Sequence, residues 1–288
     1  MSSEQSLRLA LPKGRMFDGV ERLLADAGVI VRTASRAYRP TISGAAMEAK
    51  MLKPQNIIEM LDMGTRDLGF AGADWVKELG ANLVELLDTA LDPVWLVVAA
   101  PNKLLQDGAL PPRQLTVASE YAKLTADWQQ QGGRQDTFVR SFGSTEVFPS
   151  EDADYILDIT STGATLDANG LTIVEKIFQS STRLYASRKA MQDPQKAKKI
   201  QDFCLVLQSV LEGRRRVMVE ANVPPEKLPE VMQIFPAMKQ PTVANLLGDQ
   251  GYAIKSVVEK KQVIALIPAL KNAGACDIII TNLAKVVL

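Results

Sequence analysis

The spacing of apolar and polar residues predicts short strands that alternate with helices over the first two thirds of the chain. Leu7–Leu11 alternates and is expected as a buried first strand, and Met16–Ala27 then repeats apolar residues at the period of a helix. Gly28 is expected to end this helix, and Pro54 to open a later one. Further strands are expected at residues 29–33, 46–52, 67–72, 94–100, 116–119, 137–142, 156–159, 172–180 and 183–186, and further helices at 54–63, 74–79, 121–131 and 194–212. This alternation predicts an α/β fold with helices on the faces of a sheet.

The order of elements changes after Arg214–Arg216. Strands are expected at residues 217–223, 243–247, 252–259 and 277–281, with helices at 225–235 and 260–273. The order β-α-β-β-α-β within about 70 residues predicts a ferredoxin-like domain. Because the three arginines are expected to be exposed, we place a domain border near Gly213, which gives parts of residues 1–212 and 213–288.

Composition restricts the chemistry open to this chain. Its 288 residues include 33 Lys plus Arg and 33 Asp plus Glu, so we expect no nucleic-acid partner and no attraction to an anionic membrane. It has no histidine and only Cys204 and Cys276, which argues against Ser-His and Cys-His catalysis, a zinc site and disulfides. Carboxylates, Lys, Arg, hydroxyls, amides and an oxygen-bound cation remain, and Mg²⁺ suits that set. The polar start Met1–Gln5 and the shortness of the apolar runs predict a cytoplasmic protein without a membrane span.

A hydroxyl-rich turn follows the expected strand at residues 156–159. This strand carries Asp158 to its C-terminal end, where ligands of open α/β sheets bind, and Thr160–Thr165 come directly after it. Hydroxyls and closely spaced amides can hold a phosphate monoester, and Gly163 permits the positive φ that lets phosphate approach the backbone. Because Asp158 would repel phosphate, it suits ribose hydroxyls or a Mg²⁺-linked water, and phosphate with a diol is the chemistry of ribose 5-phosphate. A polar turn that only caps the next element is the alternative that these residues leave open.

The segment Asp158–Leu166, with Glu146, Ala153, Asp154 and Asn169–Leu171, resembles the signature region of the ATP phosphoribosyltransferase family. Further segments that resemble the family, spread over nearly the whole chain, are Leu9–Arg15, Asp67–Gly72, Ser119–Tyr121, Gln240–Thr242, Gly248–Gln250 and Leu270–Ala275. Two positions depart from its pattern. Residues 149–152 are one residue shorter than the family loop and lack its usual glycine, which puts the local loop path in doubt. Lys53 stands where the family often has arginine, which keeps the charge and loses the bidentate fork.

The resemblance implies the long form of this family, which catalyses the first step of histidine biosynthesis. Its fold would be a two-lobed catalytic part, similar to periplasmic binding proteins with a central cleft, followed by an ACT-like regulatory domain. The lobes would comprise residues 1–93 with 185–212, and residues 94–184. In the implied reaction, N1 of the adenine of ATP attacks the anomeric carbon of phosphoribosyl pyrophosphate (PRPP) and pyrophosphate leaves. A ring nitrogen carries its own lone pair, so the reaction needs positioning and charge neutralisation more than a strong base.

The resemblance also implies roles for individual residues. The catalytic residues would be Asp158, Glu146 and Lys13. PRPP would contact Asp158, Thr160, Ser161, Thr162, Gly163, Ala164, Thr165 and Leu166. ATP and pyrophosphate would contact Lys13, Gly14, Arg15, Lys53, Gly72 and Tyr121. Glu146 and Asp158 would hold Mg²⁺ through water; the alternative for the basic residues is a solvated surface charge, and for Tyr121 it is packing.

The C-terminal domain would bind histidine as a feedback inhibitor, as the long form does. Candidate contacts are Glu220, Asn222, Thr242 and Ala275. The resemblance further implies a homo-oligomer in which dimers assemble into hexamers.

Three other functions remain open from the residues. One is a two-lobed solute- or effector-binding protein without catalysis, which would also hold an anion on loop amides. Another is a PRPP-using enzyme with a different acceptor base, and the third is an allosteric subunit without activity. The acidic Asp158 beside the turn favours an enzyme over the first and third of these.

Overall fold

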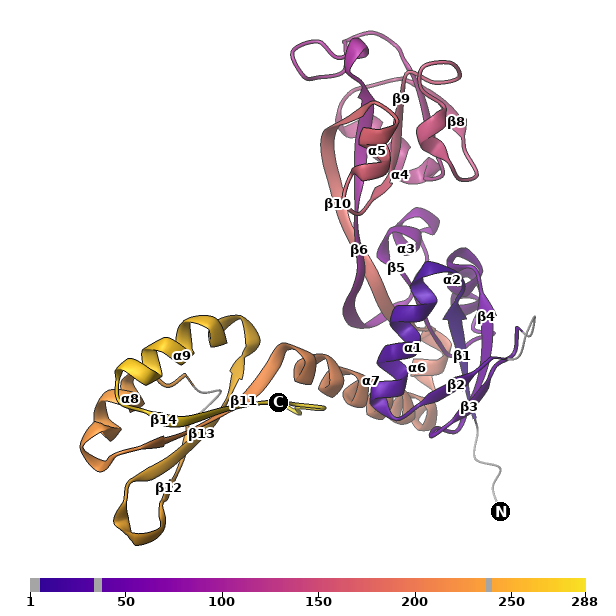
Figure 1. The fold of residues 1–288 in the computed structure, drawn as a ribbon. Helices are drawn as coiled ribbons and strands as arrows, with labels where there is room; N and C mark the ends of the chain where they lie inside the picture. The colour runs from indigo at the N-terminus through magenta and orange to yellow at the C-terminus, as the bar shows by residue number, and fades with distance from the viewer. Residues whose placement is uncertain (1–5, 34–37, 237–239) are drawn as a thin grey trace, which may run out of the picture. The chain divides into compact units, whose positions relative to one another are not determined.

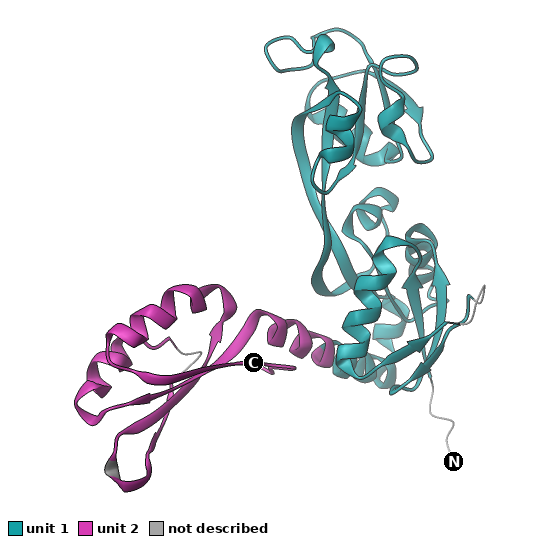
Figure 2. Ribbon diagram, in the orientation of Figure 1, with its two compact units in different colours: residues 1–204 teal, residues 205–288 magenta. Residues whose placement is uncertain are grey.

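The computed structural model describes residues 6–33, 38–236 and 240–288, so the prediction made from the polar start Met1–Gln5 lies outside the described residues. The chain forms two compact units, Met1–Cys204 and Leu205–Leu288 (Figure 2). Each unit has hydrophobic core clusters of its own. In the described parts of the chain, no helix is both long and apolar enough to cross a membrane.

The first unit alternates strands and helices, as the sequence predicts (Figure 1). Its strands are β1 Leu7–Pro12, β2 Ile30–Arg32, β3 Thr41–Ser43, β4 Met47–Leu52, β5 Leu68–Gly72, β6 Val84–Pro101, β7 Thr116–Ser119, β8 Thr137–Arg140, β9 Tyr155–Thr160 and β10 Leu171–Ala186. Its helices are α1 Arg15–Ala27, α2 Pro54–Asp62, α3 Ala73–Leu79, α4 Ala122–Gln131, α5 Ala164–Ala168, α6 Arg188–Gln192 and the first part of α7 Pro194–Arg215.

Two half-sheets share the long strands β6 and β10. Among the described residues, one sheet has eight strands in the order β4-β1-β5-β10-β6-β9-β7-β8. Strands β4, β1 and β5 are parallel, and so are β9, β7 and β8. The antiparallel pair β6–β10 lies between these groups, because β5 pairs with Thr182–Ala186 of β10 and β9 pairs with Trp95–Ala99 of β6 (Figure 1). This is the two-lobed α/β arrangement similar to periplasmic binding proteins, and it confirms the expected fold.

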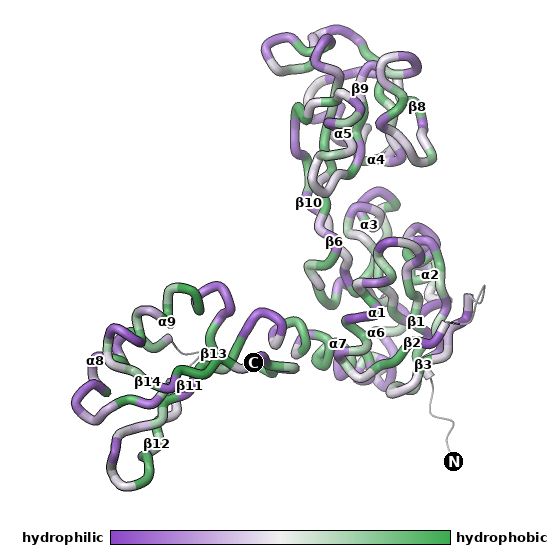
Figure 3. Tube along the Cα trace, in the orientation of Figure 1, coloured by the Kyte–Doolittle hydropathy of each residue, from purple (hydrophilic) through white to green (hydrophobic). Residues whose placement is uncertain are grey.

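Separate apolar clusters hold the two halves. In the first, α2 packs Ile57, Ile58 and Leu61 on the β1–β5 face, and Pro54 starts this helix at a position where no amide donor is needed. In the second, β6 and β9 supply fully buried aliphatic side chains to clusters on both faces of the sheet. The hydropathy tube shows the same pattern, with apolar stretches recurring along strands of both units (Figure 3).

The shared strands are longer than the apolar pattern predicts. The expected strands 172–180 and 183–186 form one strand, β10, with register shifts around Ser180–Thr182. Strand β6 begins at Val84, ten residues before the apolar run. This added part mixes apolar and polar residues without a continuous apolar run, and its carboxylates Glu85 and Asp88 pair with Arg183 of β10. Its strand structure depends on that tertiary pairing, so local hydrophobicity does not reveal it.

The second unit has the ferredoxin-like order that the sequence predicts. Its strands are β11 Arg216–Val223, β12 Thr242–Asn245, β13 Tyr252–Glu259 and β14 Cys276–Asn282, and its helices are α8 Leu228–Ile234 and α9 Val263–Asn272. In the described residues these strands form an antiparallel sheet of four in the order β12-β13-β11-β14. Alternate residues of β11 are buried with Val231 of α8 and Leu270 of α9 in one core.

The expectation that Arg214–Arg216 form an exposed boundary is wrong in part. Helix α7 continues through Gly213 to Arg215, and Arg216 opens β11 with its guanidinium against Glu212. The side chain of Arg216 is 16% exposed. Gly213 itself is buried against the backbone of Ala284. A Cβ at this position would lie 2.8 Å from the Ala284 carbonyl oxygen, so the contact requires glycine.

Candidate active site

Asp158 lies near the C-terminal end of β9, an inner strand of the second half-sheet. The residues before it, Tyr155–Leu157, are fully buried between the clusters on the two faces. One oxygen of the Asp158 carboxylate accepts the backbone N–H of Ile159 at 2.7 Å, and the Thr145 hydroxyl also donates to this carboxylate. The side chain is therefore held in one orientation at the end of a rigid strand.

Like charges surround Asp158. Burial raises the pKa of Asp158 to about 6, and the negative charges of Glu120 and Glu146 add to the rise, while the hydrogen bonds from Thr145 and Ile159 oppose it. Glu146 lies in the short helical turn Thr145–Val147, and Glu120 follows β7. The structure thus brings the predicted residues Asp158 and Glu146 together, and adds Glu120 to them.

The turn Thr160–Thr165 is mostly exposed and partly bonded to itself. Gly163 has φ 87°, the left-handed value that its sequence position suggested. Its N–H donates to Thr160 Oγ1 at 3.0 Å, and the N–H of Ala164 donates to Thr162 Oγ1 at 3.3 Å. Helix α5 begins at Ala164, so the turn also caps the next element, as the alternative expected. Ser161, Thr162, Ala164 and Thr165 are exposed, whereas Leu166 is 4% exposed and belongs to the core.

The basic residues leave the first half-sheet at one edge. Strands β1 and β4 are parallel with Pro12 opposite Leu52, so Lys13 and Lys53 emerge from neighbouring strand ends. Gly14 has φ 74° and is exposed with Arg15, which starts α1. The Lys13 ammonium lies 3.5 Å from the centre of the Tyr38 ring.

The positive charge of Lys53 also affects Glu120 in the second half-sheet. Burial raises the pKa of Glu120, and the positive charges of Lys53 and Arg140 oppose that rise. A guanidinium nitrogen of Arg140 donates to the carbonyl of Glu120 at 3.3 Å. Glu120 therefore lies within electrostatic range of Lys53 from the first half-sheet and of Asp158 in the second. Its position beside Tyr121 in a family segment was the signal that could have identified it.

Two of the predicted ATP contacts lie in a buried network. Tyr121 is 1% exposed, its hydroxyl donates to Asp74 Oδ2 at 2.7 Å, and its ring stacks on Trp75. Gly72 is buried, and a Cβ there would lie 2.2 Å from Asp74 Oδ1. These contacts agree with the alternative role of Tyr121, which is packing. A role of Tyr121 or Gly72 in ATP binding stays a prediction. Asp74 was missed because its partner Tyr121 is distant in the sequence.

The carboxylates near Asp158 suit a Mg²⁺ ion that is bound mainly by substrate oxygens and water. Among the described residues, no group of three or more His, Cys, Asp or Glu is arranged to hold a metal ion. Mg²⁺ commonly uses one or two carboxylates together with substrate oxygens and water. Burial raises the pKa of Asp158, and the charges of Glu120 and Glu146 add to the rise, so a cation beside Asp158 and Glu146 would favour the charged form of this carboxylate.

Two of the predicted histidine contacts, Glu220 and Thr242, lie on one face of the second unit's sheet. Glu220 and Thr242 both lie opposite Lys255 on neighbouring strands, so they share a face of the sheet. Asn222 donates to Asp277 Oδ2 at 2.9 Å. Ala275 is 2% exposed and belongs to the core on the other face, so it offers a ligand only its backbone.

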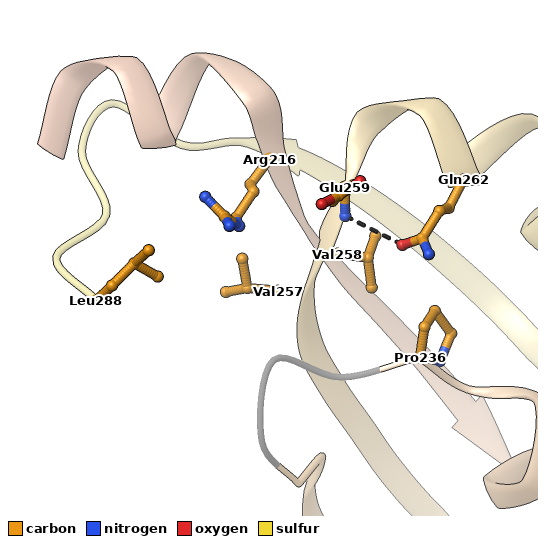
Figure 4. A pocket seen from close by; sticks show the side chains of 7 residues that line it. All are labelled: Arg216, Pro236, Val257, Val258, Glu259, Gln262 and Leu288. Carbon is orange, nitrogen blue, oxygen red and sulfur yellow. Dashed lines mark hydrogen bonds between the residues drawn. The ribbon is translucent and has the colours of Figure 1, made fainter. Parts of the chain in front are cut away.

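A cavity of about 320 Å³ lies elsewhere in this unit (Figure 4). Arg216, Val257, Glu259 and Leu288 are among its lining residues. The Glu259 N–H donates to Gln262 Oε1 at 3.3 Å beside it. None of the predicted site residues lines this cavity.

The fold and these groups define a two-lobed α/β protein with a candidate ligand site at the strand ends and a ferredoxin-like second unit. The family model described as ATP phosphoribosyltransferase matches residues 53–209, and the model described as HisG, C-terminal domain matches residues 213–285. The chain therefore belongs to the ATP phosphoribosyltransferase family, in its long form.

Relatives match over nearly the whole length. The ATP phosphoribosyltransferase of Pelotomaculum thermopropionicum is 35% identical over 286 residues, which are 98% of this chain and 99% of that protein. The ATP phosphoribosyltransferase of Chlorobium luteolum is 35% identical over 291 residues, covering 99% of each. A solved chain from the ATP phosphoribosyl transferase (HisG:HisZ) complex of Thermotoga maritima aligns with a TM-score of 0.64 and 28% identity, covering 72% of this chain and 98% of its own.

Proposed function

We propose that this chain catalyses the first step of histidine biosynthesis. N1 of the adenine of ATP attacks the anomeric carbon of PRPP, and pyrophosphate leaves. The observation that carries the proposal is Asp158 held at the end of β9 directly before the Thr160–Thr165 turn, in a chain that matches ATP phosphoribosyltransferases over its whole length. A binding protein without catalysis is not favoured, because the relatives that match the whole chain are named as transferases.

The turn after β9 holds the 5-phosphate of PRPP in this proposal. Its exposed members Ser161, Thr162, Ala164 and Thr165 offer hydroxyls and amides to phosphate oxygens, and Leu166 anchors the turn in the core. Asp158 and Glu146 accept the ribose hydroxyls. Their negative charge also supports the positive charge that grows on the ribosyl ring as pyrophosphate leaves.

Lys13, Arg15 and Lys53 neutralise pyrophosphate and the phosphates of ATP. The emergence of Lys13 and Lys53 from neighbouring strand ends supports this role, because two positive charges close together attract a polyanion. Gly14 lets the backbone turn at φ 74° between Lys13 and Arg15. Gly72 and Tyr121 complete the proposed ATP site from the buried side.

Mg²⁺ belongs to the proposal as the cofactor. Asp158 and Glu146 would hold it through water, and the ion would supply charge neutralisation to the pyrophosphate oxygens. The repulsion between Asp158 and its acidic neighbours supports this assignment.

Regulation by histidine, oligomerisation and a cytoplasmic location are further parts of the proposal. Histidine binds the second unit at Glu220, Asn222, Thr242 and the backbone of Ala275, and lowers turnover. The shared sheet face of Glu220 and Thr242 supports this placement. The functional form is a homo-oligomer of dimers that assemble into hexamers.

Replacement of Asp158 tests the site directly. Asp158→Asn removes the charge and keeps the shape, so we expect kcat with PRPP to fall by about 100-fold. Asp167→Asn, an exposed carboxylate on α5, serves as the matched control and keeps normal turnover. Near-normal activity of folded Asp158→Asn would remove Asp158 from the site.

Thr165→Val should raise the KM for PRPP, and an unchanged KM would argue against the phosphate-binding role of the turn.

A further inference from the structure

Two carboxylates of α3 hold the start of α4. The hydroxyl of Tyr121, which precedes α4, donates to Asp74 Oδ2 at 2.7 Å. The two oxygens of Glu78 accept the N–H groups of Lys123 at 3.0 Å and Leu124 at 2.9 Å. Asp74 and Glu78 are four residues apart, so they lie on the same face of α3. Both are buried, at 4% and 8% exposed, and these contacts therefore form without competition from solvent.

Asp74 is itself fixed from β10. The Ser180 hydroxyl donates to Asp74 Oδ1 at 2.6 Å, and the Asp74 N–H donates to Ser180 Oγ at 3.0 Å. Gly72 leaves the space that the Asp74 carboxylate fills, since a Cβ at Gly72 would lie 2.2 Å from Oδ1. The Tyr121 hydroxyl is thus bound to a group that cannot shift without breaking contacts to a second strand.

The same turn is bonded to the strand that carries Asp158. Ser119 Oγ accepts the Tyr121 N–H at 2.9 Å and donates to the carbonyl of Leu157 at 2.5 Å. Leu157 directly precedes Asp158. Glu120, whose charge acts on Asp158, lies between Ser119 and Tyr121. Hydrogen bonds of Ser119 thus connect the Tyr121 backbone, next to Glu120, to the strand that carries Asp158.

We propose that Asp74 and Glu78 are positioning residues for the transferase reaction, which fix the Ser119–Tyr121 turn and through it the end of β9. This inference rests on the proposed function. Neither carboxylate needs to touch a substrate, because both act through α4 and Tyr121. Misplacement of reacting groups by about 1 Å can cost up to about 100-fold in rate, so loss of this support has a kinetic effect beyond its effect on stability.

The test uses the full chain and a double-mutant cycle. Tyr121→Phe removes the donor of the bond between α3 and the turn, and Asp74→Asn removes the negative charge of its acceptor, each with little change in shape. We expect Tyr121→Phe to lower kcat/KM for PRPP by about tenfold and Asp74→Asn to lower it by less, and the double variant to lower it no further than Tyr121→Phe alone, because both changes act on one contact. Asp127→Asn, which changes an exposed carboxylate of α4 paired with Lys123, is the control and keeps normal kinetics.

Glu78 supplies an independent arm. Glu78→Ala removes both acceptors for the α4 amides, whereas Glu78→Gln keeps one of them, so kcat/KM should fall with Ala and recover in part with Gln. The melting temperature of each variant is measured alongside. A purely structural role would lower the melting temperature and leave kcat and KM of the folded enzyme unchanged.

Three outcomes would overturn the inference. Unchanged kcat and KM in Asp74→Asn, Tyr121→Phe and Glu78→Gln would limit these contacts to stability. Additive losses in the double variant would show that Tyr121 affects turnover independently of Asp74, and would remove the positioning role from Asp74. A wild-type chain that releases no pyrophosphate would overturn the proposed function and this inference together, whereas an active wild type with unaffected variants would overturn the inference alone.

Discussion

Two acidic side chains of the first unit illustrate how local surroundings decide the role of a carboxylate. Asp67 is 1% exposed; burial would raise its pKa, but hydrogen bonds from Arg8 and Lys196 hold the pKa below its ordinary value. Burial raises the pKa of Asp158 to about 6, and the charges of Glu120 and Glu146 add to the rise. Asp67 therefore stabilises the fold. Asp158 lacks such cationic partners among the described residues, and a bound cation or hydrogen-bond donor would stabilise its charged form.

The Asp67 site should make stability sensitive to acid. Because the folded pKa of Asp67 lies below the unfolded value of about 3.9, its stabilisation is complete above about pH 5 and is lost as pH falls toward the folded pKa. Asp67→Asn should lower the free energy of unfolding at pH 7 by about 3 kcal/mol. Urea unfolding at pH 7 and pH 3 measures this, and the difference between wild type and variant should shrink at pH 3.

Asp127→Asn provides the comparison for that measurement. Its partner Lys123 is exposed, so this ion pair should contribute only about 0.5 kcal/mol at pH 7. An Asp67→Asn variant as stable as Asp127→Asn at pH 7 would show that Asp67 is not a stabilising charge.

At the residue scale, the sequence identifies side chains that stand beside their partners and misses those whose partners are distant. Asp158 and the Thr160–Thr165 turn are contiguous, so their chemistry is visible in the order of residues. The bond from Tyr121 to Asp74 spans 47 positions and appears only in the structure. From the sequence, Tyr121 could serve either ATP binding or packing, and nothing points to Asp74.

At the scale of elements, the turn between β9 and α5 combines two tasks. Its Thr162 hydroxyl accepts the first N–H of α5, from Ala164, and the turn exposes hydroxyl groups toward solvent. Gly163 makes this geometry possible because its φ of 87° is strained for any other residue.

Gly163→Ala should disturb the turn through strain alone. A Cβ there would contact only Ile173, at 3.7 Å, which is an ordinary separation. We expect the KM for PRPP to rise by about fivefold, which corresponds to about 1 kcal/mol of strain. Gly170→Ala, at φ 69° with no atom within 4 Å, carries similar strain beyond α5 and should leave this KM unchanged. Equal KM values in the two variants would contradict a specific role of the turn.

The sequence predicts the bounds of elements that have their own apolar pattern. It does not predict the bounds of elements that form only through pairing with a distant strand. Strands β7 and β13 have the bounds that apolar alternation gives. The start of β6 has no apolar run and is a strand because β10 pairs with it. Helices α5 and α6 have five residues each, too short for a helical period to appear in the sequence.

At the scale of the whole molecule, the second unit offers one sheet face away from its helices. Glu220 and Thr242 lie on this face, about 10 Å apart across Lys255, since each strand spacing is about 4.8 Å. A histidine molecule can span that distance with its charged groups and its ring.

Changes on that face should weaken inhibition by histidine. Glu220→Gln and Thr242→Val each remove one polar contact, so the histidine concentration for half-inhibition should rise by about tenfold, relative to the uninhibited rate of each variant. Lys271→Ala, an exposed change on α9, is the control. Inhibition that is equally strong in all three variants would contradict the proposed histidine site.

The most direct measurement of the central claim is pyrophosphate release by the full chain with ATP, PRPP and Mg²⁺, together with identification of the nucleotide product. We predict release that requires both substrates and yields ATP phosphoribosylated at N1. A folded chain that releases no pyrophosphate, or that releases it with another base in the absence of ATP, would contradict the account.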